Sequence, residues 1–159
     1  MKKVIEEFYT LPEKNQKILS QIDFSDTFST TNQCHSIVGI GKLIFETYPK
    51  WIEVLMNLRN RIMAVFGLKT EMPADYHEDD YIGFFKIFSQ NKQELVLGMD
   101  DKHLNFRVCI INTHQVNYNI KVVTLVAYNN AFGRYYMFVI KPFHRLVVKR
   151  MVLQAFCKR

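Results

Sequence analysis

The sequence lacks any stretch that could cross a membrane or direct export. No apolar run approaches the roughly 20 residues that span a bilayer. The opening residues, MKKVIEEFYTLPEK, place adjacent acids and a proline where a signal peptide needs an unbroken apolar core. We therefore expect a cytoplasmic protein without a transmembrane segment.

Cysteine is scarce. Cys34, Cys109 and Cys157 are odd in number, widely spaced and without a C-x-x-C pair. This pattern favours reduced thiols that behave as small buried apolar groups, with a reactive thiol as the alternative.

Short catalytic and cofactor motifs are missing as well. The chain contains no G-x-S-x-G elbow, no H-E-x-x-H helix, no P-loop and no G-x-G-x-x-G. The turn Asp100-Asp101-x-His103 offers two carboxylates and one imidazole, but adjacent carboxylates on a strand project to opposite faces. We expect no cofactor, no metal and no identifiable catalytic residue.

Acidic residues are absent from position 141 onward. The other basic residues balance the 15 acids, so the entire net charge of +6 comes from the basic residues of this segment. These are Lys141, Arg145, Lys149, Arg150, Lys158 and Arg159. On a helix, Arg134, Lys141, Arg145 and Lys149 would form one basic stripe. The chain has no recognised nucleic-acid motif, so we expect no nucleic-acid partner.

What remains is the composition of an ordinary globular protein, 48% hydrophobic and 23% charged. We expect one domain over residues 21–159. Residues 1–20 lack a sustained period, and Leu11-Pro12 interrupts any helix there, so they form a lead-in segment.

Two helices are expected in succession. Thr31 and Asn32 supply N-cap chemistry for a helix over about 34–47, and Pro49 begins a second helix with Gly67 as its C-cap. The second helix carries an apolar stripe at three- and four-residue intervals: Trp51, Leu55, Leu58, Ile62 and Val65.

Strands are expected before and after this pair of helices. A short strand covers 23–30, and period-two patterns cover 81–89, 94–99, 103–113 and 116–129. Because the last four are joined by short turns, they should be antiparallel neighbours. Leu104, Phe106 and Val108 should face inward, which leaves His103, Asn105 and Arg107 on a solvated outer face.

A long helix over 132–157 closes the chain. Pro142 removes one of its backbone hydrogen bonds and predicts a kink. A helical wheel predicts that an apolar arc faces the sheet: Tyr135, Tyr136, Val139, Phe143, Leu146, Val147 and Leu153. Arg150 falls inside this arc, and we favour fraying of the helix end over burial with a carboxylate partner.

Several short motifs occur in order along the chain. They are Asp26-x-Phe28, FETYPKW over 45–51, Leu58-Arg59-Asn60, Phe66-Gly67-Leu68, Leu97-Gly98-x-Asp100-Asp101-x-His103-Leu104-x-Phe106-Arg107, Asn130-x-x-Gly133-Arg134-x-Tyr136 and Lys141-Pro142-Phe143-His144-Arg145. Together they resemble the bacterial family catalogued as domain of unknown function 2867. The element order resembles the START-like or SRPBCC helix-grip superfamily.

The resemblance implies an α+β fold in which a curved antiparallel sheet and a long C-terminal helix close a cavity. Superfamily members bind lipids, polyketides, steroids and other apolar molecules, so we expect a non-enzymatic binding domain for a small apolar ligand. The competing interpretation is that aromatic and aliphatic side chains fill the space between helix and sheet and leave no cavity. Expected ligand contacts are Tyr48, Trp51, Phe85, Tyr118, Thr124, Tyr128, Tyr136, Phe143, Arg107 and His144.

Two other functions stay open. An enzyme of the cyclase or dehydratase kind needs a titratable group inside the cavity, and Asp26 and His144 are the candidates. An interaction module would instead dock a redox partner or an acidic surface through the basic stripe.

Overall fold

A single antiparallel sheet organises the protein. The computed structural model describes residues 1–65 and 76–159, without the side chains of Ile62 and Met63. Seven strands lie in the order β1-β2-β7-β6-β5-β4-β3. Their bounds are Val4–Glu6, Phe24–Thr30, Tyr81–Ile82, Phe85–Gln90, Glu94–Asp100, Leu104–Asn112 and Ile120–Tyr128 for β1 to β7. The predicted α+β class, with a curved antiparallel sheet and a long C-terminal helix, is confirmed.

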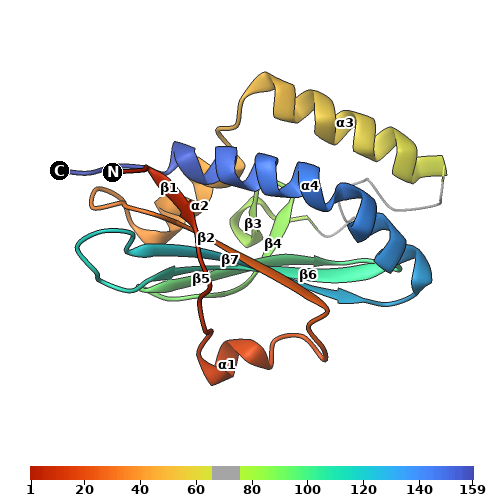
Figure 1. The fold of residues 1–159 in the computed structure, drawn as a ribbon, viewed down its shortest axis with the longest axis horizontal. Coiled ribbons are helices and arrows are strands. Elements are labelled where there is room, and N and C mark those ends of the chain that lie inside the picture. Colours follow the sequence, from red (N-terminus) through yellow and green to blue (C-terminus); the bar gives the residue numbers. More distant parts are fainter. Residues whose placement is uncertain (66–75) are drawn as a thin grey trace.

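The sheet has a front face under the larger helices and a back face under the N-terminal segment (Figure 1). Alternation along the strands sorts the side chains between the two. On the front, Phe28, Val108 and Val122 belong to one apolar cluster with α2 and the end of α4. On the back, Val123 and Leu125 join a second cluster with Leu11 and Leu19. Both faces of β7 are therefore buried.

The helices follow the predicted order with shifted ends. Helix α2 covers Ile37–Phe45, and its N-cap is Ser36, whose hydroxyl accepts from the Gly39 N–H at 3.2 Å. The predicted cap at Thr31 and Asn32 is wrong, because the helix begins only at Ile37; Asn32 Oδ1 instead accepts from the Cys34 and His35 N–H groups ahead of it. Helix α3 covers Lys50–Val65; its expected C-cap, Gly67, lies outside the described residues.

Helix α4, Ala131–Gln154, crosses the front face and is capped by Asn130, whose Oδ1 accepts from the Gly133 N–H. Gly133 allows the closest approach to the sheet, since a Cβ there would lie 2.0 Å from the His103 carbonyl oxygen. Pro142 lies in the middle of α4, and the helix changes direction along its length (Figure 1). This bend agrees with the predicted kink.

The inward face of α4 differs from the prediction. Gly133, Met137 and Val152 are buried against the sheet, and His144 also points inward. The predicted inner arc is largely outside: Tyr135 is 66% exposed, Phe143 60% and Leu146 59%. Arg150 is exposed although the helix continues to Gln154, so the predicted fraying is wrong. The wheel failed because this helix is apolar on more than one side.

The predicted strand over 81–89 is divided in two. Gly83, with φ of +60°, sits between β3 and β4, and a Cβ there would approach the Phe45 carbonyl oxygen to 3.0 Å. Glycine adopts this backbone conformation without the steric penalty of a side chain. The chain therefore turns at Gly83, and β3 folds back on β4 as the last strand of the sheet.

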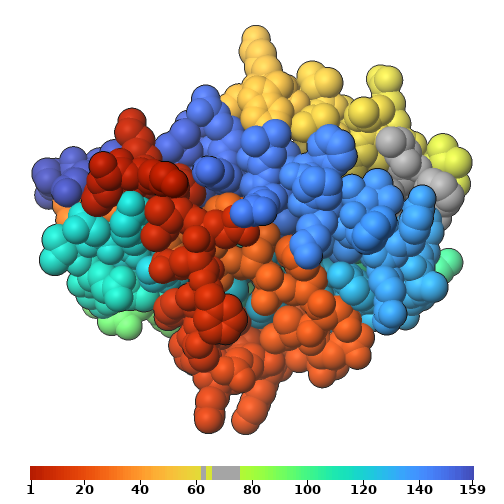
Figure 2. Space-filling model, viewed as in Figure 1, coloured from red at the N-terminus to blue at the C-terminus, as the bar shows by residue number. Residues whose placement is uncertain are grey.

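Residues 1–20 pack on the sheet that residues 21–159 build. Strand β1 pairs with β2, and the chain then continues onto the back face, where α1 covers Glu13–Gln16. Figure 2 shows these N-terminal residues, in red, running from the helical layer down past the sheet edge. Lys14 Nζ lies 2.6 Å from Glu94 Oε2, and the Asn15 amide donates to Glu94 Oε1. These contacts anchor α1.

Two of the three cysteines are not reduced. Cys34 and Cys157 form a disulfide with Cα atoms 6.0 Å apart, which corrects the expectation of three free thiols. Cys109 is free and fully buried, and burial raises the pKa of its thiol to about 12. It therefore has the predicted character of a small apolar group.

Candidate functional site

Three aromatic rings line part of the front face beside α4. The Phe85 ring of β4 stands edge-on to Phe45 of α2 at 5.1 Å and to Phe106 of β6 at 5.2 Å, measured between centroids. Phe85 and Phe106 are only half-buried, whereas the core residues nearer β2 are fully buried. We call Phe45, Phe85 and Phe106 the aromatic wall.

A polar contact joins α3 to α4. Arg59 Nε donates to the Tyr136 hydroxyl at 3.0 Å, and the same guanidinium donates to Asn60 Oδ1. Arg59 and Tyr136 are both half-buried. An apolar surface with a few fixed polar groups is typical of a small-molecule site.

An acid and a base meet under α4. His144 Nε2 lies 3.3 Å from Asp26 Oδ2, with side-chain exposures of 20% and 10%. The alignment is not that of a hydrogen bond, and Asp26 Oδ1 also has no hydrogen-bond partner among the described residues. Thr124 lies opposite Asp26 on the neighbouring strand. Buried polar atoms left unpaired are rare, so we treat the Asp26–His144 contact as a candidate site.

An open groove of about 430 Å³ runs along the outer edge of β2. Asp26 and Arg145 line it from the front, Thr27 and Leu125 line it from the sheet, and Tyr9 belongs to the N-terminal segment. The Asp26–His144 pair is therefore next to a space that a small molecule can enter.

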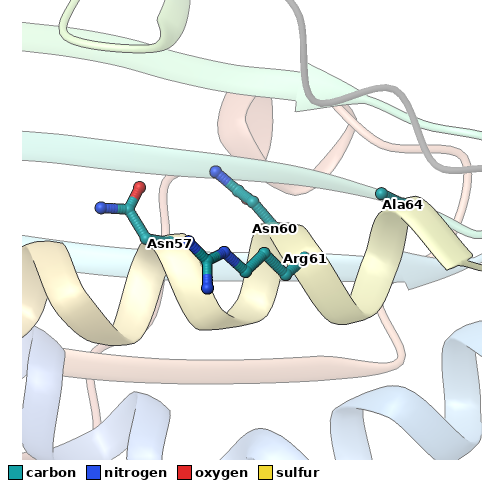
Figure 3. Close-up of a pocket in the computed structure, with 4 residues that line it drawn as sticks. All are labelled: Asn57, Asn60, Arg61 and Ala64. Carbon is teal, nitrogen blue, oxygen red and sulfur yellow. The ribbon is translucent and has the colours of Figure 1, made fainter.

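A second hollow, of about 470 Å³, lies on α3 and is lined by Asn57, Asn60, Arg61 and Ala64 (Figure 3). All four residues come from successive turns of one helix, and Asn57 and Asn60 project from the same side. Its described lining comes from one helix and does not enclose a ligand, so we assign it no function.

Four of the expected ligand residues lie on the front face. Phe85 belongs to the aromatic wall, Tyr136 contacts Arg59, and Thr124 and His144 flank Asp26. The structure thus places them at three points: the aromatic wall, the contact between α3 and α4, and the Asp26–His144 pair.

Other expected residues lie elsewhere. Arg107 is buried on the back face, where its guanidinium pairs with Asp100 at 2.7 Å and stacks on Phe88 at 3.7 Å, so the predicted solvated position is wrong. Tyr118 lies in the loop before β7 and donates to the Lys2 carbonyl oxygen. Trp51 and Phe143 are 40% and 60% exposed.

Tyr48 and Tyr128 stand at the ends of elements. Tyr48 is half-buried between α2 and α3. Tyr128 ends β7, and burial, reinforced by the Asp23 carboxylate, raises the pKa of its phenol above the ordinary value of 10.0. Among the described residues, no hydrogen bond or ring contact joins either tyrosine to the aromatic wall.

Sequence reasoning did not select Phe45, Phe106 or Arg59. Phe106 had a usable signal, because it alternates with Leu104 and Val108 on the predicted inner face. Phe45 and Arg59 belong to the quoted motifs, but no pattern assigned them to a site, since their helices could be placed on the sheet only after the tertiary contacts were known.

The basic stripe on α4 is exposed but partly neutralised. Arg145 Nε donates to Glu6 Oε2 at 2.6 Å, and Lys141 lies 5.2 Å from the Phe24 ring centroid. Within the described residues, no helix has the length and apolarity needed to span a bilayer.

The fold defines an α+β protein whose antiparallel sheet is crossed by a long C-terminal helix. Over residues 18–151 the sequence matches a family described as a protein of unknown function (DUF2867), and the chain belongs to that family. No curated protein and no solved structure gives a significant match.

Proposed function

We propose that the protein is a non-enzymatic binding domain of the helix-grip (START/SRPBCC-like) kind. Its ligand is a small, largely apolar molecule, lipid-, polyketide- or steroid-like, held against the aromatic wall beside α4. The observation that supports this is the half-exposed state of Phe85 and Phe106 on the face that α4 covers elsewhere. Burial of that surface by a ligand would be favourable by about 25 cal/mol per Å².

The neighbouring helix supplies further support. Trp51, Val54, Leu58 and Val65 of α3 are between 40% and 82% exposed, which is unusual for an apolar stripe of a folded helix. The Arg59–Tyr136 contact would provide a polar anchor for a carboxylate or hydroxyl of the ligand.

Native mass spectrometry with palmitate and cholesterol as probes tests the proposal. We expect a one-to-one adduct with the wild type that Phe106→Ser weakens at least about tenfold, through loss of apolar contact. Phe106→Leu should retain the adduct, because it keeps the wall apolar. The matched control is Phe138→Ser, which removes an aromatic ring that is 79% exposed on the outer face of α4. Absence of any adduct, or equal loss in the control, would contradict the proposal.

A second candidate is an acid/base enzyme of the cyclase or dehydratase kind, favoured by the Asp26–His144 contact beside the β2 groove. His144 would move a proton while Asp26 orients the imidazole. Cyclisation of polyketide-like thioesters, followed by mass spectrometry, should then be lost in His144→Gln and in Asp26→Asn. Turnover that survives both substitutions would exclude this mechanism.

A further inference from the structure

A cysteine, a histidine and a second cysteine meet at the end of the molecule opposite the N-terminus of α4. Cys34 and His35 belong to the segment between β2 and α2, and Cys157 belongs to the tail after α4. One ligand atom from each lies within 4.8 Å of the others. Two sulfurs and an imidazole are the donors that zinc-like cations prefer.

The backbone holds these residues together independently of the disulfide. The Gln33 N–H donates to the Cys157 carbonyl oxygen at 2.9 Å, and the Cys157 N–H donates to the Thr31 carbonyl oxygen at 2.9 Å. The buried Asn32 side chain donates to the Ala155 carbonyl oxygen at 2.6 Å. Reduction of the bridge would therefore leave both thiols side by side.

Asn32 also positions the two neighbouring ligands. Its Oδ1 accepts from the backbone N–H groups of Cys34 and His35 at 3.0 and 2.9 Å. Its Nδ2 lies 3.2 Å from His35 Nδ1. Outer contacts of this kind orient metal ligands in protein sites.

We propose that Cys34, Cys157 and His35 form a binding site for a divalent zinc-like cation when the disulfide is reduced. A small dithiol supplies two electrons and two protons, the S–S bond breaks to give two thiols, and the dithiol becomes a disulfide. The cation then replaces both thiol protons, which pass to solvent. In the reverse direction a small disulfide accepts two electrons from the thiolates and two protons from solvent to become a dithiol, the Cys34–Cys157 bond re-forms, and the cation is released.

The geometry suits this exchange. Zn–S bonds of about 2.3 Å at a tetrahedral angle place the two sulfurs about 3.8 Å apart. Cα atoms 6.0 Å apart permit that separation by side-chain rotation alone. Three protein ligands leave a fourth position for water. His35 is exposed and both cysteines are half-buried, so the cation has access.

The test uses the full chain, reduced with dithiothreitol and freed of it by gel filtration under nitrogen. We expect the reduced protein to bind one equivalent of Zn²⁺ and to give a sulfur-to-metal charge-transfer band with Co²⁺. The oxidised protein should bind neither ion at this site. Cys34→Ser should abolish the band, and His35→Ala should weaken binding at least about tenfold, a loss that even an outer-shell change can cause.

Two matched variants serve as controls. Cys109→Ala removes the buried third cysteine, and His77→Ala removes an exposed histidine outside the cluster. Both should bind one equivalent, as the wild type does. Binding that persists in the oxidised protein or in Cys34→Ser would overturn the proposal, as would a reduced protein that binds no ion. Loss of the native circular dichroism on reduction would refute the claim that the backbone holds the site.

Discussion

The two layers that cover the sheet are attached by different means. The front layer, α2 and α4, packs through a continuous apolar cluster and is closed by the Cys34–Cys157 disulfide. The back layer, residues 7–20, has a smaller apolar cluster and is attached by charges. Apolar burial and a covalent link do not depend on protonation, whereas ion pairs do.

The charges of the back layer are buried and well paired. Lys121 is 5% exposed and donates to Glu7 Oε1, which also accepts from the Ser29 hydroxyl. Glu94, also buried, accepts from Lys14 and Asn15. Burial and the nearby Glu94 carboxylate raise the pKa of Tyr9 above its ordinary value. On the front, by contrast, Asp26 and His144 are close without a hydrogen bond. The two layers therefore differ in how completely their buried charged groups are paired.

The largest expected loss of stability comes from removing the disulfide that closes the front layer. Cys34→Ala should lower the free energy of unfolding by about 4 kcal/mol, because the bridge joins residues 123 positions apart and such links usually contribute about 2–4 kcal/mol or slightly more. Urea denaturation under oxidising conditions measures this change. Hydrogen exchange in residues 7–20 should stay as in the wild type below the unfolding transition. Equal loss of protection in both layers would show that they are not independently attached.

A slightly smaller loss of stability is expected from removing an ion pair of the back layer. Glu7→Gln leaves the buried Lys121 ammonium without a charged partner and should lower the free energy of unfolding by about 3 kcal/mol, the lower part of the range for a broken buried pair, since Glu7 is one-third exposed. The neighbouring Glu6→Gln is the control: its partner Arg145 is 66% exposed, and the loss should be under about 1 kcal/mol. Similar losses in the two variants would contradict the assignment.

Acid should separate the layers without any substitution. Burial tends to raise the pKa of Glu7, but the hydrogen bonds from Lys121 and Ser29 outweigh it and hold the pKa below the ordinary value of 4.5. The stability contributed by Glu7 is therefore complete above pH 4.5 and is lost as the pH falls through the folded-state value. Hydrogen exchange measured below pH 4.5 should show early opening of residues 7–20. The same experiment on Glu7→Gln should show a weaker pH dependence.

The smallest expected effect tests which side of α4 faces the sheet. Phe138→Ala should change the free energy of unfolding by no more than about 0.5 kcal/mol, because the ring is 79% exposed. The adjacent Met137→Ala should be destabilising by about 2–5 kcal/mol, because Met137 is buried. Thermal and urea denaturation of the two variants measures both. A larger loss in Phe138→Ala would reverse the assigned faces.

The sheet was predictable and the placement of α4 was not. In the first half of β6, apolar residues alternate with Asn105 and Arg107, and Phe106 and Val108 do belong to the front cluster. Helix α4 offers apolar residues on several sides, while its true inner row contains Gly133 and His144. Hydrophobicity alone therefore selects the wrong side.

Long-range partners had no local signal. Cys34 and Cys157 are 123 positions apart. Residues 1–20 attach through a three-residue strand, a few apolar side chains and single polar contacts, none of which leaves a sustained period. One feature of the whole sequence does indicate long-range ion pairs: no acidic residue follows Asp101. The cations of β6, β7 and α4 must therefore find carboxylates from earlier in the chain, as Arg107, Lys121 and Arg145 do. Of the candidate site, the sequence indicated Phe85, Tyr136, Asp26 and His144, but not how they are grouped.

The end of strand β1 connects the sheet edge to both covering layers. Glu6 and Glu7 are consecutive, so their side chains leave opposite faces of the sheet, and one reaches Arg145 of α4 while the other reaches Lys121 on the back. The last residue of β1 and the residue that follows it thus contact opposite layers at the same edge of the sheet. Loss of either ion pair alone would therefore loosen only its own layer, whereas displacement of this segment from the sheet edge would remove one ion pair from each layer.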